Sequence, residues 1–206
     1  MKVLLLNGSP HEKGCTYTAL EEVARTLEAD GVQAEIFWLG KEPISGCVGC
    51  GACGRLGKCV YDDVVNRAAE KVRECDGLVV GSPVHYAAAS GQITCALDRL
   101  FFSAGKDLRL KPGAAVVSAR RAGTTAALDQ LNKYFMINQM PVVSSRYWNM
   151  VHGSAPEEVH RDEEGMAVMR TLGHNMAWLL KAIAAGRAAG LPEPAQEPPA
   201  RTNFIR

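Results

Sequence analysis

The sequence predicts an α/β protein built on a five-stranded parallel sheet that helices cover on both faces. Three observations lead to this fold class. Short apolar runs recur along the 206 residues, stretches with the apolar spacing of a helix face separate them, and turn-forming residues follow the runs. Runs that are apolar throughout are typical of strands buried on both faces, which occur in parallel sheets with right-handed crossover helices.

The first apolar run, residues 3–6, leads through a small polar loop into a helix predicted over residues 16–29. A helix N-terminus carries unpaired backbone N–H groups and a partial positive charge, and both favour a phosphate. The hydroxyls of Ser9, Thr16 and Thr18 would add donors. We expect a mononucleotide phosphate here, because the loop matches neither the Walker sequence nor the dinucleotide fingerprint. The alternative is a turn with a threonine cap and no ligand.

The remaining predicted elements continue the alternation. Strands are predicted over residues 33–39, 78–80, 114–118 and 141–145, and helices over residues 62–74, 93–101, 124–137 and 165–185. Ligands of such sheets bind beyond the carboxyl ends of the strands, where the strand order reverses. The loops after the first, third and fourth strands are therefore expected to form one site. Residues 191–206 contain four prolines and are predicted to be an extended or disordered tail, which leaves a single domain over residues 1–190.

Composition argues against several classes of protein. The chain has 23 basic and 22 acidic residues and a net charge of +1, so no field of a single sign points to nucleic acid or to an anionic membrane. The apolar runs are too short to cross a bilayer, and the sequence opens on a strand rather than a signal peptide. We therefore expect a cytoplasmic protein that acts on small molecules, with no nucleic-acid or membrane partner.

Four of the seven cysteines, Cys47, Cys50, Cys53 and Cys59, lie within thirteen positions of a glycine-rich loop. In a reducing compartment such a group indicates a metal or redox site before disulfides. The two-residue gaps are those of bacterial ferredoxin runs, and the glycines give the loop freedom to wrap a cubane cluster. Zinc usually binds two separated pairs of ligands. A [4Fe-4S] cluster, free thiols and zinc, in that order, are the alternatives.

Motifs spread along the chain resemble those of one known family. They are Gly8-Ser9-Pro10 with Gly14-Cys15-Thr16, Gly81-Ser82-Pro83-Val84 with Asp98-Arg99, the run Arg121-Ala122-Gly123-Thr124-Thr125, and the run from Ser145 to Gly153. Together they are similar to NAD(P)H-dependent FMN reductases, a family of flavodoxin-like proteins. The cysteine spacing resembles that of the iron-sulfur flavoproteins within this family. The resemblance covers the chain to about Lys181.

The resemblance implies a flavodoxin-like sheet with strand order 2-1-3-4-5 and non-covalent FMN at the ends of strands one, three and four. Carried over by position, the residues that would hold the phosphate are Ser9, Gly14, Thr16, Tyr17 and Thr18. Those along the flavin ring would be Pro83, Val84, His85 and Tyr86, with Ser118, Arg120 and Gly123 on the other side. Two positions depart from the family pattern: Cys15 stands where many members have Asn, and His85 where an aromatic residue is common.

The implied function is an FMN-dependent oxidoreductase that takes NADH or NADPH as co-substrate and reduces a small electron acceptor such as a quinone, a nitroaromatic compound, free flavin or iron. Because the flavin carries the chemistry, no catalytic side chain is expected. One alternative is an electron carrier that docks to a redox protein. Another is a redox or metal sensor whose cysteine loop is the functional output. The family favours homodimers or homotetramers.

Overall fold

In a computed structural model, residues 1–200, 202 and 204 are described, and among them five parallel strands form one sheet in the order β2-β1-β3-β5-β6. The strands are β1 (Lys2–Asn7), β2 (Gln33–Trp38), β3 (Gly77–His85), β5 (Gly113–Ala119) and β6 (Met150–His152), and the short β4 (Ala88–Ala89) pairs antiparallel with β3. Counted as parallel strands, this is the order 2-1-3-4-5. The flavodoxin-like topology is thereby confirmed.

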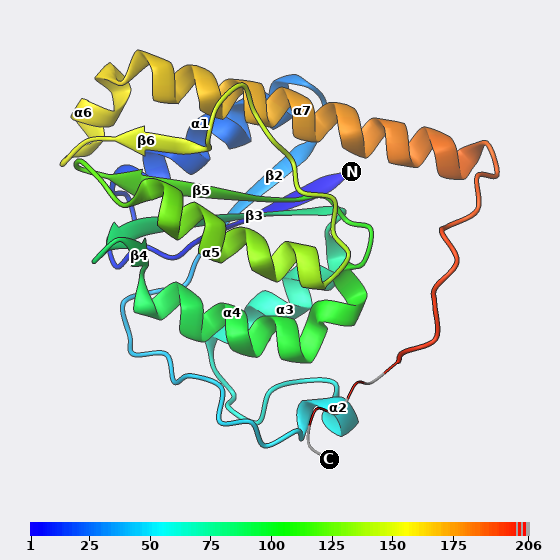
Figure 1. The fold of residues 1–206 in the computed structure, drawn as a ribbon. Helices are drawn as coiled ribbons and strands as arrows, with labels where there is room; N and C mark the ends of the chain where they lie inside the picture. The colour runs from blue at the N-terminus through cyan, green and yellow to red at the C-terminus, as the bar shows by residue number, and fades with distance from the viewer. Residues whose placement is uncertain (201, 203, 205–206) are drawn as a thin grey trace.

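Helices cover both faces of the sheet (Figure 1). They are α1 (Cys15–Ala29), α2 (Cys53–Leu56), α3 (Val64–Glu74), α4 (Gly91–Ala104), α5 (Thr124–Ile137), α6 (Pro156–Arg161) and α7 (Glu163–Ala188), with a 3₁₀ turn η1 (Gly105–Leu108) after α4. α1, α6 and α7 lie on one face, and α3, α4 and α5 lie on the other. Among the described residues, no helix combines the length and the apolar character needed to cross a bilayer.

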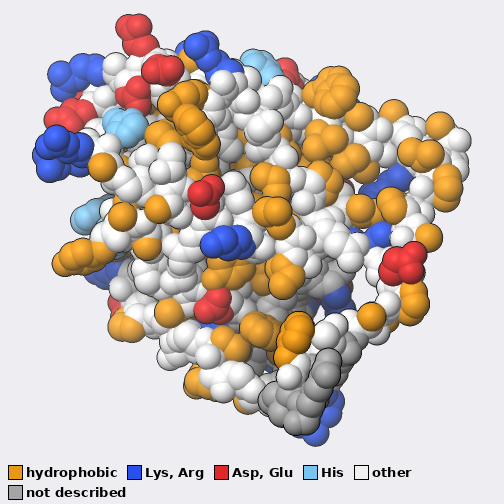
Figure 2. Space-filling model, in the orientation of Figure 1, with side chains coloured by type: hydrophobic (Ala, Val, Ile, Leu, Met, Phe, Trp, Pro, Cys, Tyr) orange, Lys and Arg blue, Asp and Glu red, His pale blue; other side chains and the backbone are white. Residues whose placement is uncertain are grey.

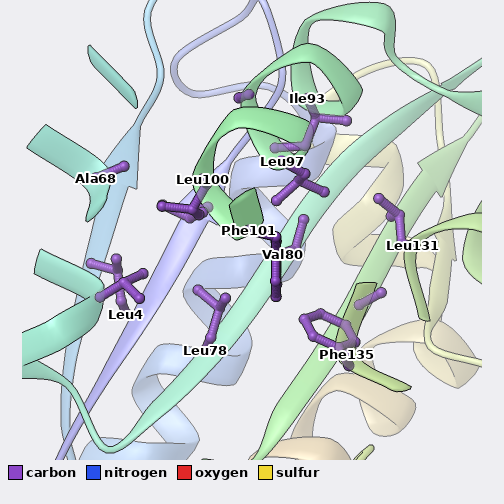
Figure 3. Packing of buried hydrophobic residues seen from close by; sticks show 14 of the residues in the cluster. Leu4, Ala68, Leu78, Val80, Ile93, Leu97, Leu100, Phe101, Leu131 and Phe135 are labelled. Atoms are coloured by element: carbon purple, nitrogen blue, oxygen red, sulfur yellow. The ribbon is translucent and has the colours of Figure 1, made fainter. Parts of the chain in front are cut away.

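Two apolar layers join the helices to the sheet. In one of them, Val80 of β3 lies beside Leu97 of α4, and Leu4 and Leu78 belong to the same layer, as Figure 3 shows. Because successive side chains of a strand point to opposite faces, β1 sends Leu4 into this layer and Val3 and Leu5 into the layer beneath α1 and α7. This two-sided burial explains why the first apolar run has no polar residue, as the sequence analysis assumed.

The fifth strand does not lie where the sequence predicted it. We expected it over residues 141–145, but Val142 makes only an isolated bridge to Gly113. Regular pairing with β5 occurs at β6, where Met150 stands opposite Val117. The prediction was wrong because residues 141–143 are the more strand-like in composition, whereas long-range hydrogen bonds along β5 decide which segment pairs. The residues between Val142 and Met150 are not part of the sheet.

The third strand is longer than predicted. We expected residues 78–80 followed by a loop, but β3 continues through Pro83, which stands opposite Ser118 of β5. It then turns at Tyr86 and Ala87, whose φ angles are 51° and 59°, and returns as β4. Such a turn, with positive φ at both central residues, is the usual connection of a two-residue hairpin.

Several helical segments also differ from the predicted elements. α2 interrupts the cysteine loop, and neither α6 nor η1 was predicted. α4 and α7 are longer at both ends than residues 93–101 and 165–185. After α7, residues 191–200 form no regular structure, and Glu193 binds the side chains of Arg109 and Arg187 at 2.9 and 3.1 Å. Residues 201, 203 and 205–206 of the predicted tail lie outside the described residues.

Candidate cofactor sites at the sheet edge and in the cysteine loop

The loop between β1 and α1 leaves the N-terminus of α1 without a side-chain cap. Gly14 is the N-cap residue, and no side chain bonds the first turn. Among the described residues, the backbone N–H groups of Cys15, Thr16 and Tyr17 meet no acceptor. A Cβ at Gly14 would lie 3.0 Å from Cβ of His11, so the backbone is closely packed here. No threonine caps this helix, so the cap in the alternative prediction is wrong. The unpaired N–H groups are suited to an anion, and the bound phosphate stays a prediction.

Of the hydroxyl groups predicted for the phosphate site, that of Ser9 lies in the loop and that of Thr16 points to β5. The Ser9 hydroxyl oxygen accepts the His11 N–H at 3.1 Å, and its own O–H meets no acceptor among the described residues. Thr16 Oγ1 lies 2.8 Å from Ser118 Oγ, both of them buried. This contact joins the start of α1 to the end of β5. A residue predicted for the phosphate, Thr16, and a residue predicted beside the flavin ring, Ser118, therefore lie together.

The other two hydroxyls predicted for the phosphate site are engaged within α1. Thr18 donates to the carbonyl oxygen of Gly14 at 3.3 Å, and Tyr17 donates to Glu21 at 3.0 Å. Burial, together with the bond to Glu21, raises the pKa of Tyr17. In this conformation the hydroxyl groups of Tyr17 and Thr18 lie beside the loop, but neither is free to donate a hydrogen bond to a ligand.

The β3–β4 hairpin carries the residues predicted to lie along the flavin ring. Pro83 and Val84 are half-buried, His85 is exposed, and Tyr86 is fully exposed to solvent. Ser90, which follows the hairpin, fixes its place: its hydroxyl donates to the Gly8 carbonyl oxygen at 3.0 Å. The sequence analysis did not single out Ser90, although a serine just before an apolar helix is a common N-cap, and its side chain does cap α4.

The β5–α5 loop closes the other side of the sheet edge. Gly123 caps α5 with φ of 90°, and a Cβ there would lie 2.6 Å from Cα of Ala87 in the hairpin. Only glycine combines this φ with this approach. Ser118 is buried, and Arg120 is exposed. The structure thus brings the three loops expected from the sequence to one edge of the sheet.

Cys15, one of the two departures from the family pattern, serves as a contact between elements. Its Sγ donates to the carbonyl oxygen of Gly153 at 3.6 Å, which ties the start of α1 to the loop after β6. Burial raises the pKa of Cys15, which favours the neutral thiol.

The cysteine loop starts at the same edge and runs along the outer side of α4 (Figure 1). Gln92, at the start of α4, donates to the Gly40 carbonyl oxygen at 2.7 Å. Near the end of α4, the Phe102 carbonyl oxygen accepts from Cys53 Sγ at 3.5 Å. The two contacts place the beginning of the loop near the candidate flavin site and its cysteines near the opposite end of α4.

All four clustered cysteines line one cavity of about 100 Å³, with Val48, Val60 and Phe102 among its apolar walls. Among the described residues, no three side chains of His, Cys, Asp or Glu converge closely enough to hold one ion. A zinc site needs that convergence. In a [4Fe-4S] cluster, each thiolate binds a different iron atom around the cubane. Four sulfur atoms around one shared cavity are a donor set that fits a [4Fe-4S] cluster.

Arg99 is the residue at this site whose role the sequence analysis missed. Its side chain is fully buried and pairs with both carboxylate oxygens of Asp63, at 2.7 and 2.8 Å. Burial alone would raise the pKa of Asp63, but hydrogen bonds from Arg99 and from a backbone N–H lower it. The sequence did contain a signal for this role, because Arg99 is a charged residue on the same buried face of α4 as Ala96 and Leu100.

Comparison with known proteins finds relatives over most of the chain. The family model described as NADPH-dependent FMN reductase matches residues 1–155. An iron-sulfur flavoprotein of Methanocaldococcus jannaschii is 31% identical over 191 residues, which cover 89% of this chain and 99% of that protein. A crystal structure of RosB with a bound riboflavin-phosphate intermediate superposes with a TM-score of 0.70 at 15% identity, over 100% of this chain and 92% of RosB.

A flavodoxin from the domain Archaea superposes with a TM-score of 0.61 at 15% identity and covers 88% of this chain and 99% of its own. At such identities the two structures bear on the fold alone, whereas the family model spans most of the sequence. The chain belongs to the NADPH-dependent FMN reductase family and is a flavin-dependent oxidoreductase with iron-sulfur flavoproteins among its relatives.

Proposed function

We propose that the protein binds FMN at the carboxyl edge of its sheet and transfers electrons from NADH or NADPH to a small acceptor, with a [4Fe-4S] cluster held by the cysteine loop. The observation that carries the proposal is the convergence of an uncapped helix N-terminus with two loops at one edge of the sheet. When bound, FMN supplies both two-electron and one-electron transfer. The acceptor that we propose is a quinone, a nitroaromatic compound, free flavin or iron.

The residues of the sheet edge have separate tasks in this proposal. The N–H groups of residues 15–17 and the Ser9 hydroxyl bind and orient the phosphate, so no cation needs to contact it. The hairpin from Pro83 to Tyr86 supports one side of the ring, and the β5–α5 loop with Gly123 holds that hairpin in place. The exposed His85 and Tyr86 leave room for a nicotinamide or an acceptor to approach.

The relatives' name, iron-sulfur flavoprotein, supports the cluster. Cys47, Cys50, Cys53 and Cys59 would be its ligands, and it would supply one-electron transfer. Ser90 lies at the flavin edge and Phe102 lines the cysteine cavity, twelve residues apart on α4, which is about 18 Å along a helix axis. Since the two sites of one chain lie so far apart, the binding of FMN and that of iron can be altered independently.

Anaerobic purification, followed by FMN titration, an absorption spectrum, and iron and sulfide analysis, tests both sites. We expect one FMN for each chain and a full complement of cluster iron. Cys50→Ser should lose iron but keep FMN, while Cys75→Ala is the matched control, because Cys75 is buried away from the loop. A protein that refuses FMN under gentle reconstitution would end the flavin proposal. Iron bound equally by Cys50→Ser would end the assignment of the ligands.

Steady-state oxidation of NADPH with a quinone separates the reductase from its alternatives. Turnover supports the reductase. A cluster and flavin that cycle with a chemical reductant, without turnover of NADPH, would support a carrier for a redox protein or a cysteine-loop sensor. Basic and acidic side chains are interspersed over the face shown in Figure 2. The net charge of +1 favours the reductase, because carriers often steer their partners with a strongly acidic face.

We also propose a homodimer or homotetramer. Tyr147 and Trp148, in the segment that leaves the sheet before β6, are about half exposed and stack edge to face with ring centroids 4.4 Å apart. They would contact either a substrate or a second subunit. Sedimentation of the wild-type protein and of Trp148→Ala decides between these roles: dissociation assigns Trp148 to the subunit contact, and an unchanged assembly with altered kinetics assigns it to the substrate.

A further inference from the structure

We propose that Arg99, together with Asn66, is a positioning residue for the fourth cysteine ligand: the pair holds Cys59 in place and keeps a positive charge and an N–H donor against its sulfur. This inference rests on the proposed cluster of the cysteine loop. It adds to that proposal a residue outside the cysteine motif that sets how tightly the cluster is held and at what potential it is reduced.

Every N–H group of the Arg99 guanidinium has an acceptor. Nε donates to Cys59 Sγ at 3.2 Å. Nη1 donates to the Ser45 carbonyl oxygen at 3.3 Å and to Asp63 Oδ2 at 2.7 Å. Nη2 donates to the Tyr61 carbonyl oxygen at 3.1 Å and to Asp63 Oδ1 at 2.8 Å. Because all five donors are used and the side chain is fully buried, the guanidinium has one orientation and joins both ends of the cysteine loop to α4.

Asn66 holds the backbone of the same cysteine. Its Oδ1 accepts the Cys59 N–H at 3.0 Å, and its Nδ2 donates to the carbonyl oxygens of Cys59 and Tyr61, each at 3.0 Å. Asn66 is buried in α3, the helix that Asp63 caps. Cys59 is therefore fixed through its backbone by α3 and through its sulfur by α4.

The other three cysteines are held far less. Cys47 and Cys50 are exposed, and no hydrogen bond to either sulfur is present among the described residues. Cys53 makes one contact, from its sulfur to the Phe102 carbonyl oxygen. We infer that Cys59 is the preset ligand and that the segment carrying the other three closes around the cluster.

The charge and the donor have a predictable effect on a bound cluster. Hydrogen bonds to ligand sulfurs and nearby positive charge stabilise the more negative, reduced state and so raise the reduction potential. Asp63 offsets the charge of Arg99, which makes the N–H···S bond the part that acts on Cys59 most directly. Removing Arg99 alone would leave the half-buried Asp63 carboxylate without its partner, and removing Asp63 alone would leave a fully buried guanidinium unpaired, which is strongly destabilising.

The test therefore compares Arg99→Lys with the double variant Asp63→Asn/Arg99→Met. The double variant keeps the net charge of the pair at zero but removes the donor to Cys59, and replacing both partners limits the loss of stability. Arg170→Lys is the matched control, because Arg170 pairs with Glu22 on α1, away from the loop. The measurements are iron and sulfide per chain, the rate of iron loss to a chelator, the midpoint potential of the cluster, and FMN affinity.

We expect the double variant to lose iron faster than wild type and to have a lower midpoint potential, with FMN affinity unchanged. Arg99→Lys, which keeps a charge but not the fork of donors, should lie between. Variants that hold iron as firmly as wild type, at the same potential, would overturn this inference and leave the proposed function intact. A wild-type protein that takes up no cluster would overturn both. If the double variant loses FMN binding as well, it has not folded, and Arg99→Lys decides alone.

Discussion

Replacing Gly123 with alanine tests whether the contact between the β5–α5 loop and the β3–β4 hairpin shapes the flavin site. The substitution has two costs. A non-glycine residue in the left-handed region costs about 1–2 kcal/mol, and φ of Gly123 is 90°. The new Cβ would also lie 2.6 Å from Cα of Ala87 and 3.1 Å from Cγ1 of Val84, and overpacking of this kind costs about 1–3 kcal/mol.

Gly31→Ala is the control that separates these two costs. Gly31 has a similar φ of 78°, but a Cβ there would meet nothing within 4 Å. We expect Gly31→Ala to lower the free energy of unfolding by about 1–2 kcal/mol through backbone strain alone. Gly123→Ala should lower it by a further 1–3 kcal/mol or so, because of the clash. Urea unfolding of the FMN-free protein measures both differences.

FMN affinity provides the second measurement. If the hairpin moves to relieve the clash, Pro83 and Val84 move with it, and the ring loses its support. Each 1.4 kcal/mol of lost contact weakens binding about tenfold, so a clear rise in the dissociation constant is expected for Gly123→Ala and none for Gly31→Ala. Fluorescence quenching on titration of FMN measures this. Equal stability and equal FMN affinity in the two variants would refute the reasoning.

Three further predictions follow from single contacts. Thr16→Val should cost about 1–3 kcal/mol in urea unfolding, because it leaves the buried Ser118 hydroxyl without its partner, and adding Ser118→Ala should recover part of that loss. The lowered pKa of Asp63 means that its contribution to stability is present above its unfolded pKa of about 3.9 and is lost as pH falls through the lower folded value. The double variant Asp63→Asn/Arg99→Met, which leaves no unpaired charge, should therefore flatten the acid limb of a stability profile. Burial and a hydrogen bond to Asp98 raise the pKa of Tyr134, so Tyr134→Phe should leave unchanged the tyrosinate absorbance that develops near pH 10; a reduced amplitude would contradict this.

Local pattern was enough to predict most elements because burial within each element follows a simple rule, either throughout a strand or along one face of a helix. β1 is buried from Val3 to Asn7, so its sequence could contain only apolar residues up to the polar turn. α3 was predicted from its spacing and from the acidic residue at its start, and Asp63 does cap it. The motifs of the candidate flavin site lie in the loops at strand ends, where the parallel alternation itself brings them together.

What the sequence by itself determined was therefore the fold class and the strand order implied by the family resemblance, while its residues for the two candidate sites stay predictions. Only the tertiary structure decided which segment completes the sheet, because residues 141–143 and β6 both bond to β5 and only the second forms a regular ladder. It also decided that Arg99 would lie against Cys59, forty residues away. Contacts of this kind depend on how helices and strands pack across the fold, so they cannot be predicted from the periodicity of apolar residues along the chain.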